Sequence, residues 1–267
     1  MVPLPRLIRK MQWKSFTYTS ETEWYGLPAQ LSWGPFTIQT SLLAVIAACA
    51  ALIVAVRLVS RFYGPTAKEA AELVQNAAFI VLLVWKFGHV LFAPSVIWDR
   101  PLAVLILNGG TREALLAAAA AAVYLVVSIR RKGIPLRIFL DLVSFGTIVA
   151  VIVYAAIDWR AGEATTKPWG IVVSSPEFRY HPISGYTIIV ALTVLLLLGL
   201  RRGKAGTGEW FRIATLYMGA GLLLVSFWEV PAPTVLLFTA YQWRALALVA
   251  AGIIFSAGAH TKTTFQH

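Results

Sequence analysis

Residues 158–186 read DWRAGEATTKPWGIVVSSPEFRYHPISGY and are the one long polar interval between the apolar runs of this chain. The interval contains three acids and a Pro-Trp-Gly turn, and the apolar run on each side is long enough to cross a bilayer. It ends in Arg179-Tyr180-His181-Pro182, which leads directly into the next apolar run. Polar and aromatic residues at this place predict a site at the membrane surface.

The composition around this interval predicts an all-α integral membrane protein. Of 267 residues, 58% are hydrophobic and 13% are charged, which leaves too little polar surface to cover a soluble globule. The net charge of +11 lies in short clusters at the ends of apolar runs, so it indicates membrane topology and not nucleic-acid binding. One cysteine excludes an internal disulfide, and the four histidines are not spaced as metal ligands, so we expect no metal and no cofactor.

Seven runs approach the roughly 20 apolar residues that a membrane-spanning helix needs. We therefore expect a seven-helix transmembrane domain over residues 34–258, after an N-terminal interfacial amphipathic segment (1–33) and before a cytoplasmic tail (259–267). The third run is broken by Asn108-Gly109-Gly110-Thr111-Arg112-Glu113, so a re-entrant hairpin is an alternative there. The expected spans are approximately 36–59, 70–92, 102–128, 138–157, 183–200, 213–228 and 235–257.

Lysine and arginine are concentrated in the connections that follow the first, third and fifth spans. The positive-inside rule places these connections in the cytoplasm, which puts the N-terminus outside and the C-terminus inside. The interval 158–186 then faces outward.

Ionisable residues at membrane depth are functional candidates because they are costly to place there. They are Lys86, His89, Arg112, Glu113, Asp141 and Arg244. Lys86 and His89 are three residues apart, so they share a helical face on which they could meet a lipid phosphate. Equally, Lys86 could extend to the interface or pair with an acid, and His89 could be a hydrogen-bonded interior residue. Arg112 and Glu113 follow the glycine break, where a role in capping the next helix is favoured.

Short motifs follow one another over roughly residues 34–231. They are Gly34-Pro35, Lys86 to Phe92, Asn108-Gly109-Gly110, Arg130-Arg131 with Asp141, Gly162-Glu163, Pro168-Trp169-Gly170, and Tyr180-His181-Pro182 with Tyr186. Their order and spacing resemble the bacterial phosphatidylglycerol–prolipoprotein diacylglyceryl transferase family. The resemblance implies that family's membrane fold and its reaction, in which diacylglycerol passes from phosphatidylglycerol to the lipobox cysteine of a prolipoprotein.

Several positions depart from the family pattern. Asn108 stands in place of the histidine of a His-Gly-Gly motif, and it cannot accept a proton from a thiol near neutral pH. Family arginines that would hold the donor phosphate fall at Ala155 and Leu222, neither of which can replace a guanidinium group. The other departures are Ser41, Asp158, Ser226 and Glu229.

These departures predict a non-catalytic relative (a pseudoenzyme) that acts as a phospholipid-binding scaffold or complex subunit in the bacterial inner membrane. The alternative is an active, divergent diacylglyceryl transferase that uses His181, His89 and Glu163. The spans show no obvious inverted repeat, which disfavours a transporter. Expected partners are a membrane phospholipid, with phosphatidylglycerol as the candidate, and a lipoprotein or another membrane protein. The expected lipid-binding residues are Lys86, His89, Asn108, Gly109, Gly110, Trp169, His181 and Tyr186.

Overall fold

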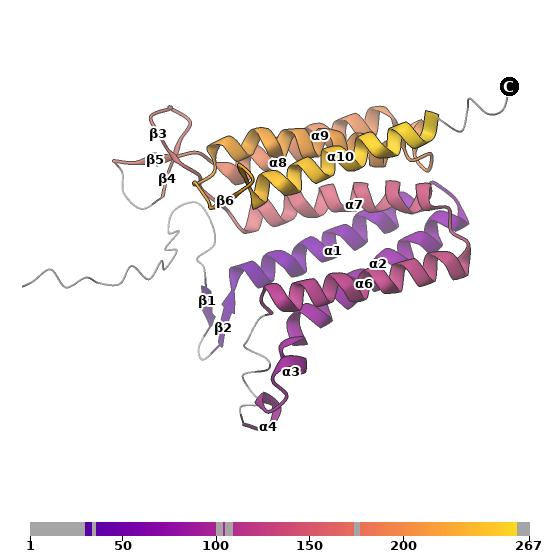
Figure 1. Ribbon diagram of the computed structural model, residues 1–267, viewed down its shortest axis with the longest axis horizontal. Coiled ribbons are helices and arrows are strands. Elements are labelled where there is room, and N and C mark those ends of the chain that lie inside the picture. Colours follow the sequence, from indigo (N-terminus) through magenta and orange to yellow (C-terminus); the bar gives the residue numbers. More distant parts are fainter. Residues whose placement is uncertain (1–29, 34–35, 100–103, 105–108, 174–176, 261–267) are drawn as a thin grey trace, which may run out of the picture.

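The computed structural model describes residues 30–33, 36–99, 104, 109–173 and 177–260. Long helices run side by side in a bundle, and short strands lie in the connections at one end (Figure 1). The helices are α1 (Thr40–Ser60), α2 (Pro65–Phe87), α3 (His89–Phe92), α4 (Val96–Asp99), α6 (Thr111–Lys132), α7 (Leu136–Ile157), α8 (Ile183–Leu200), α9 (Glu209–Val225) and α10 (Ala240–His260), with 3-10 turns η2 (Arg202–Lys204) and η3 (Ser226–Trp228). The antiparallel strands are β1 (Gln30–Trp33) with β2 (Phe36–Gln39), β3 (Ala164–Thr165) and β4 (Ile171–Val172) on either side of β5 (Arg179–Tyr180), and β6 (Thr234–Val235) with β7 (Phe238–Thr239).

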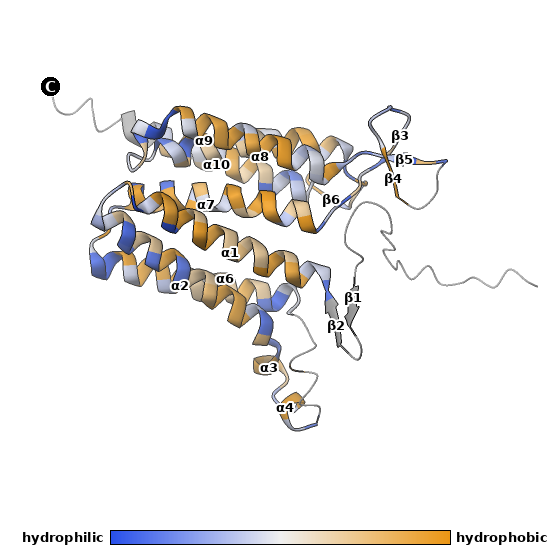
Figure 2. Cartoon of the chain, turned by 180° about the vertical axis from the view of Figure 1, so that it is seen from behind, coloured by the Kyte–Doolittle hydropathy of each residue, from blue (hydrophilic) through white to orange (hydrophobic). Residues whose placement is uncertain are grey.

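The expected fold class, an all-α multi-span membrane protein, is confirmed. Among the described residues, six helices are long and apolar enough to cross a membrane, and α10 adds a shorter apolar segment, Ala240–Ser256. Apolar residues extend along the helices, whereas hydrophilic residues gather at their ends (Figure 2). The orientation of the termini remains a prediction.

Two expected spans differ most from the observed helices. The second, expected over residues 70–92, is α2 over Pro65–Phe87, because Pro65 suits the first turn of a helix and a break at Gly88 separates α3. The third, expected from residue 102, is α6 over Thr111–Lys132, and its expected first part lies largely outside the described residues. Glu113 caps α6 as expected, because its Oε2 accepts a hydrogen bond of 2.7 Å from the Gly110 N–H.

The predicted terminal segments are only partly covered. Residues 1–29 and 261–267 lie outside the described residues, so the interfacial segment and most of the tail remain predictions. Strand β1, at the end of the expected interfacial segment, pairs with β2 immediately before α1. Helix α10 continues to His260, two residues beyond the expected end of the membrane domain.

Helix α7 is the central helix of the bundle. It packs against α1, α8 and α9, and α10 packs against α9, while α2 and α6 form a flanking pair beside α1 (Figure 1). The contact with α1 is close because Gly146 has no side chain: a Cβ there would collide with Val56. We call the end of the bundle with the connections 88–110, 158–182 and 229–239 the loop end, and the opposite end, with Arg130, Arg131 and Arg201, the basic end.

Asp141 fastens α7 to the start of α9 at the basic end. Its side chain is buried, and its Oδ2 accepts backbone hydrogen bonds from Gly206 at 2.8 Å and Gly208 at 2.9 Å. Its Oδ1 accepts another from Phe211 at 2.8 Å, in the first turn of α9. A carboxylate satisfies these amide groups, which have no partner within their own helix turn. Asp141 therefore has a structural role, although the sequence had made it a functional candidate.

We predict that Asp141→Asn destabilises the protein by about 2–3 kcal/mol, because the amide group places a donor against a backbone N–H and removes the charge of the acceptor. The measurement is the unfolding midpoint of the purified protein in detergent. Asp99→Asn, at an exposed aspartate of α4, is the matched control. Equal midpoints for the two variants would contradict this role of Asp141.

Candidate functional site

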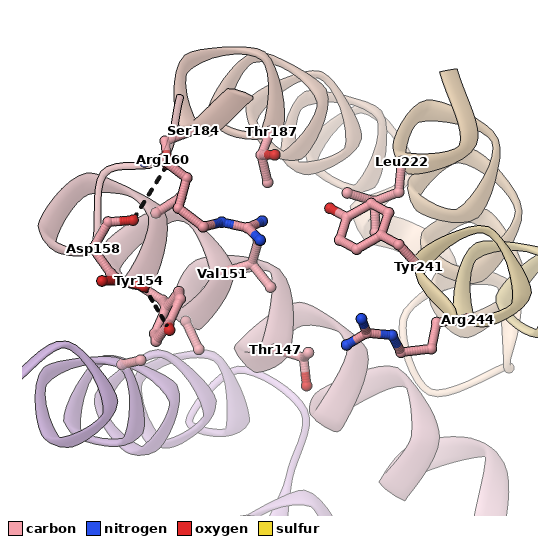
Figure 3. A pocket seen from close by; sticks show the side chains of 13 residues that line it. Thr147, Val151, Tyr154, Asp158, Arg160, Ser184, Thr187, Leu222, Tyr241 and Arg244 are labelled. Atoms are coloured by element: carbon pink, nitrogen blue, oxygen red, sulfur yellow. Dashed lines mark hydrogen bonds between the residues drawn. The ribbon is translucent and has the colours of Figure 1, made fainter. Parts of the chain in front are cut away.

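A cavity of about 410 Å³ lies beside the C-terminal half of α7, toward the loop end, and five helices contribute to its walls. Figure 3 shows the side chains of Arg160, Tyr241 and Arg244 directed into one shared space. The volume falls within the range of small-molecule sites. The lining residues are Ala48 of α1; Thr147, Ala150, Val151, Tyr154 and Ala155 of α7; Asp158 and Arg160 of the following connection; Ser184 and Thr187 of α8; Leu222 of α9; and Tyr241 and Arg244 of α10.

The start of the polar interval is fixed to α8. The Arg160 backbone N–H donates to Ser184 Oγ at 2.9 Å, and the Ser184 N–H donates to the Arg160 carbonyl at 3.3 Å. Two residues later the chain passes so close to η3 that a Cβ on Gly162 would collide with the Trp228 carbonyl. These contacts hold the base of the Arg160 side chain at the edge of the cavity.

Two guanidinium groups lie near one aromatic ring. The Cζ atom of Arg160 is 5.8 Å from the centroid of the Tyr241 ring, and that of Arg244 is 5.3 Å from the same centroid. Arg244 follows Tyr241 by three residues on α10, which places both side chains on one helical face. Such cation–π contacts orient a guanidinium group and leave its N–H donors free to bind an anion.

Arg160 forms one ion pair, with Glu229, whereas Arg244 forms none among the described residues. Glu229 Oε1 is 3.5 Å from Arg160 Nη2 and forms no hydrogen bond among the described residues. Among the residues that the structure describes, Arg244 has no carboxylate within ion-pair distance. Its Nε donates to the carbonyl of Ala240 on its own helix at 3.2 Å. Burial raises the pKa of Glu229, and the charges of Arg160 and Arg244 oppose this rise.

The remaining lining is divided between polar and apolar surfaces. Asp158, at the end of α7, accepts a 2.7 Å hydrogen bond from the Tyr154 hydroxyl, so its carboxylate is already engaged. Alanine, valine and leucine side chains from α1, α7 and α9 complete the walls. A cavity that combines cationic donors with apolar walls has the features that an amphiphilic anion requires.

Three of the predicted lipid-binding residues lie together elsewhere, in a groove of about 610 Å³. Trp169, His181 and Tyr186 line this groove with Trp228 of η3 and residues of α8 and α9. Glu163, proposed for an active enzyme, is exposed, and its carbonyl accepts the His181 N–H at 3.0 Å. None of these side chains lines the cavity of about 410 Å³ that Arg160 and Arg244 enter, which we call the arginine cavity.

The other predicted residues lie on the opposite flank of the bundle, around α2, α3 and α6 (Figure 1). Gly109 contacts the α2 backbone so closely that a Cβ would collide with the Trp85 carbonyl, and Gly110 precedes α6. His89 is half-buried, and neither of its two buried ring nitrogens has a hydrogen-bond partner within the described ranges. Lys86 and His89 line neither cavity, and Asn108 lies outside the described residues.

The structure thus divides the described residues of the expected site between two places, the groove and the flank around α2, α3 and α6. The arginine cavity is a third place, and it adds two residues that sequence reasoning missed. Ala155 and Leu222, where the resemblance places phosphate-binding arginines, both line the cavity that Arg160 and Arg244 enter. Arg160 belongs to the polar interval 158–186, and Arg244 is one of the ionisable residues expected at membrane depth. The position of Arg244 at membrane depth could have identified the site if the helices that pack around α10 had been known.

A comparison of sequences supports the family resemblance. A curated phosphatidylglycerol–prolipoprotein diacylglyceryl transferase from Wolbachia sp. subsp. Drosophila simulans (strain wRi) is 27% identical over 170 residues. The chain resembles this transferase distantly. The match covers 57% of the chain and 62% of the relative, so the chain spans less than two thirds of that transferase. No family model matches the chain.

Proposed function

We propose that this protein binds an anionic phospholipid in the arginine cavity, with the lipid phosphate between Arg160 and Arg244, and that it does so without transferase chemistry. The observation that carries the proposal is the approach of two guanidinium groups to one ring, with Arg244 lacking a carboxylate partner among the described residues. Guanidinium groups bind phosphate through paired N–H donors. Phosphatidylglycerol is the candidate lipid because the relative's name includes it.

The apolar walls support a lipid in preference to a soluble phosphate. Ala48 and Val151 line the cavity from α1 and α7, and Leu222 does so from α9, all of them within helices apolar enough to cross a membrane. Acyl chains could therefore extend from the arginines into the hydrocarbon region without burying further polar groups. The protein would act in the bacterial inner membrane as a scaffold or complex subunit, and a lipoprotein is a candidate partner at the loop end.

The acid–base groups support binding without catalysis. Transfer to a lipobox cysteine requires a proton acceptor close to the phosphate. His181, His89 and Glu163, which an active enzyme was expected to use, do not line the arginine cavity. Of the carboxylates near it, Asp158 is hydrogen-bonded to Tyr154 and Glu229 lies against Arg160.

We predict that replacing Arg160 and Arg244 together by glutamine lowers phosphatidylglycerol retention about tenfold or more. A hydrogen bond to a charged group contributes about 1.5–3 kcal/mol, and about 1.4 kcal/mol corresponds to a factor of ten. The measurement is native mass spectrometry of protein released from nanodiscs containing phosphatidylglycerol. Arg57→Gln with Arg61→Gln, which removes the same charge near the basic end, is the control. Equal retention by the two double variants would contradict the proposal.

The second candidate function is the transferase reaction itself. One observation favours it: the two arginines could stabilise the charge that develops on a departing glycerophosphate. The test is expression of the full chain in bacteria depleted of their own diacylglyceryl transferase, followed by mass spectrometry of a reporter lipoprotein. We expect no diacylglyceryl modification above the empty-vector level. Robust modification, lost on replacing Arg160 and Arg244, would establish the transferase in place of the non-catalytic function.

A further inference from the structure

The groove that contains Trp169 and His181 lies on the opposite side of α8 from the arginine cavity. Ser184 and Thr187 line the cavity, whereas Tyr186, Ile189 and Val190 line the groove. With 3.6 residues per turn, these two sets project from opposite faces of α8. A ligand in the groove is therefore separated from one in the cavity by the helix itself.

The floor and walls of the groove are apolar and lie within two spans. Helices α8 and α9 meet closely at its floor, since a Cβ on Gly221 would collide with the side chain of Val190. On either side, Ile189 is 63% exposed and Leu224 is 57% exposed. Within a membrane-spanning segment, such exposed aliphatic walls contact hydrocarbon, so the part of a ligand that fills them is an acyl chain.

Polar groups gather at the end of the groove nearest the β3–β5 sheet. The Trp169 Nε1–H donates to the Tyr186 hydroxyl oxygen at 3.0 Å, and that oxygen is 3.0 Å from His181 Nδ1. The hydroxyl still has its own proton to donate, so Nδ1 can accept it in the tautomer that has its proton on Nε2. His181 can then donate this Nε2–H to a ligand.

A lysine beside this histidine supplies the positive charge. Lys167 lines the groove, is exposed, and forms no ion pair within the part of the chain that the structure describes. It lies on the turn between β3 and β4, which Arg179 of β5 fixes by donating from Nη1 to the Pro168 carbonyl at 2.7 Å. The same turn presents Trp169, which is 58% exposed, as an aromatic residue suited to the membrane interface.

We propose that this groove is a second lipid site, which binds a phospholipid from the leaflet at the loop end. Its phosphate lies at Lys167 and His181, Trp169 and Trp228 flank the glycerol region, and one acyl chain follows Ile189 and Leu224 between α8 and α9. The ammonium and imidazole donors complement a phosphate, and the aliphatic walls complement the chain. This site does not depend on the arginine cavity, because none of its residues lines that cavity.

The test is native mass spectrometry of the full-length protein released from nanodiscs of palmitoyl-oleoyl phosphatidylglycerol. Lys167→Glu reverses the charge at the headgroup end, and Ile189→Trp fills the apolar part from an exposed position. Each variant should retain one phospholipid fewer than the wild type. The losses should be additive with the loss from the Arg160 and Arg244 glutamine variant, since the two sites are separate.

Matched controls separate this effect from general changes in charge or in the membrane-facing surface. Lys68→Glu makes the same charge change in the first turns of α2 at the basic end, and Leu115→Trp adds the same bulk at an exposed position of α6. Retention by Lys167→Glu and Ile189→Trp equal to that of these controls would overturn the second site. This outcome is distinguishable from failure of the arginine cavity, because loss of lipid in the groove variants is measured whether or not the arginine variant loses any.

Discussion

The buried carboxylate of Asp141 is the interaction on which the arrangement of the bundle depends. It accepts three backbone hydrogen bonds from the segment that begins α9, and so it joins the central helix to the last two spans. Without it, three amide groups of a helix start would have to find other partners at the edge of a membrane, where such partners are few. Since α9 also packs against α10, this contact sets the position of Arg244 at the other end of the molecule.

The contacts that organise the loop end are made by the residues that follow the C-terminal end of α7. There Ser184 holds the backbone of Arg160, and Gly162 permits close contact with the turn that carries Glu229. Arg160 and Arg244 thus reach one ring from connections and helices that are distant in sequence, because α7, α8 and α9 hold them in register. Preorganised guanidinium groups bind an anion without a further ordering cost, which is why a rigid bundle suits this role.

The sequence predicted the fold more completely than the site. Length and hydropathy locate helices such as α1 and α7 well, because crossing a bilayer requires about 20 apolar residues whatever packs beside them. They locate helix ends less well, because local capping decides where a helix begins. Helix α2 begins at Pro65 and α6 begins after Gly110, and both starts differ from the expected ones. No pattern in one sequence shows how helices are arranged around a bundle. The motifs at Lys86 and at His181 were therefore joined into one site that the structure divides.

The same limit explains why the arginines were missed. A motif comparison asks whether a guanidinium stands at a given position, and it found Ala155 and Leu222. The cavity depends instead on which side chains reach a given point in space, and Arg160 and Arg244 reach it from other elements. Positive charge can be retained at a site while its sequence positions change, provided that the scaffold brings the new positions together.

A structure of the full chain in phosphatidylglycerol nanodiscs, determined by cryo-electron microscopy, tests the central claim most directly. The account predicts headgroup density in contact with both Arg160 and Arg244 beside Tyr241, with acyl-chain density continuing along α7. A cavity occupied only by water, or an Arg244 side chain turned away to pair with a carboxylate, would contradict it.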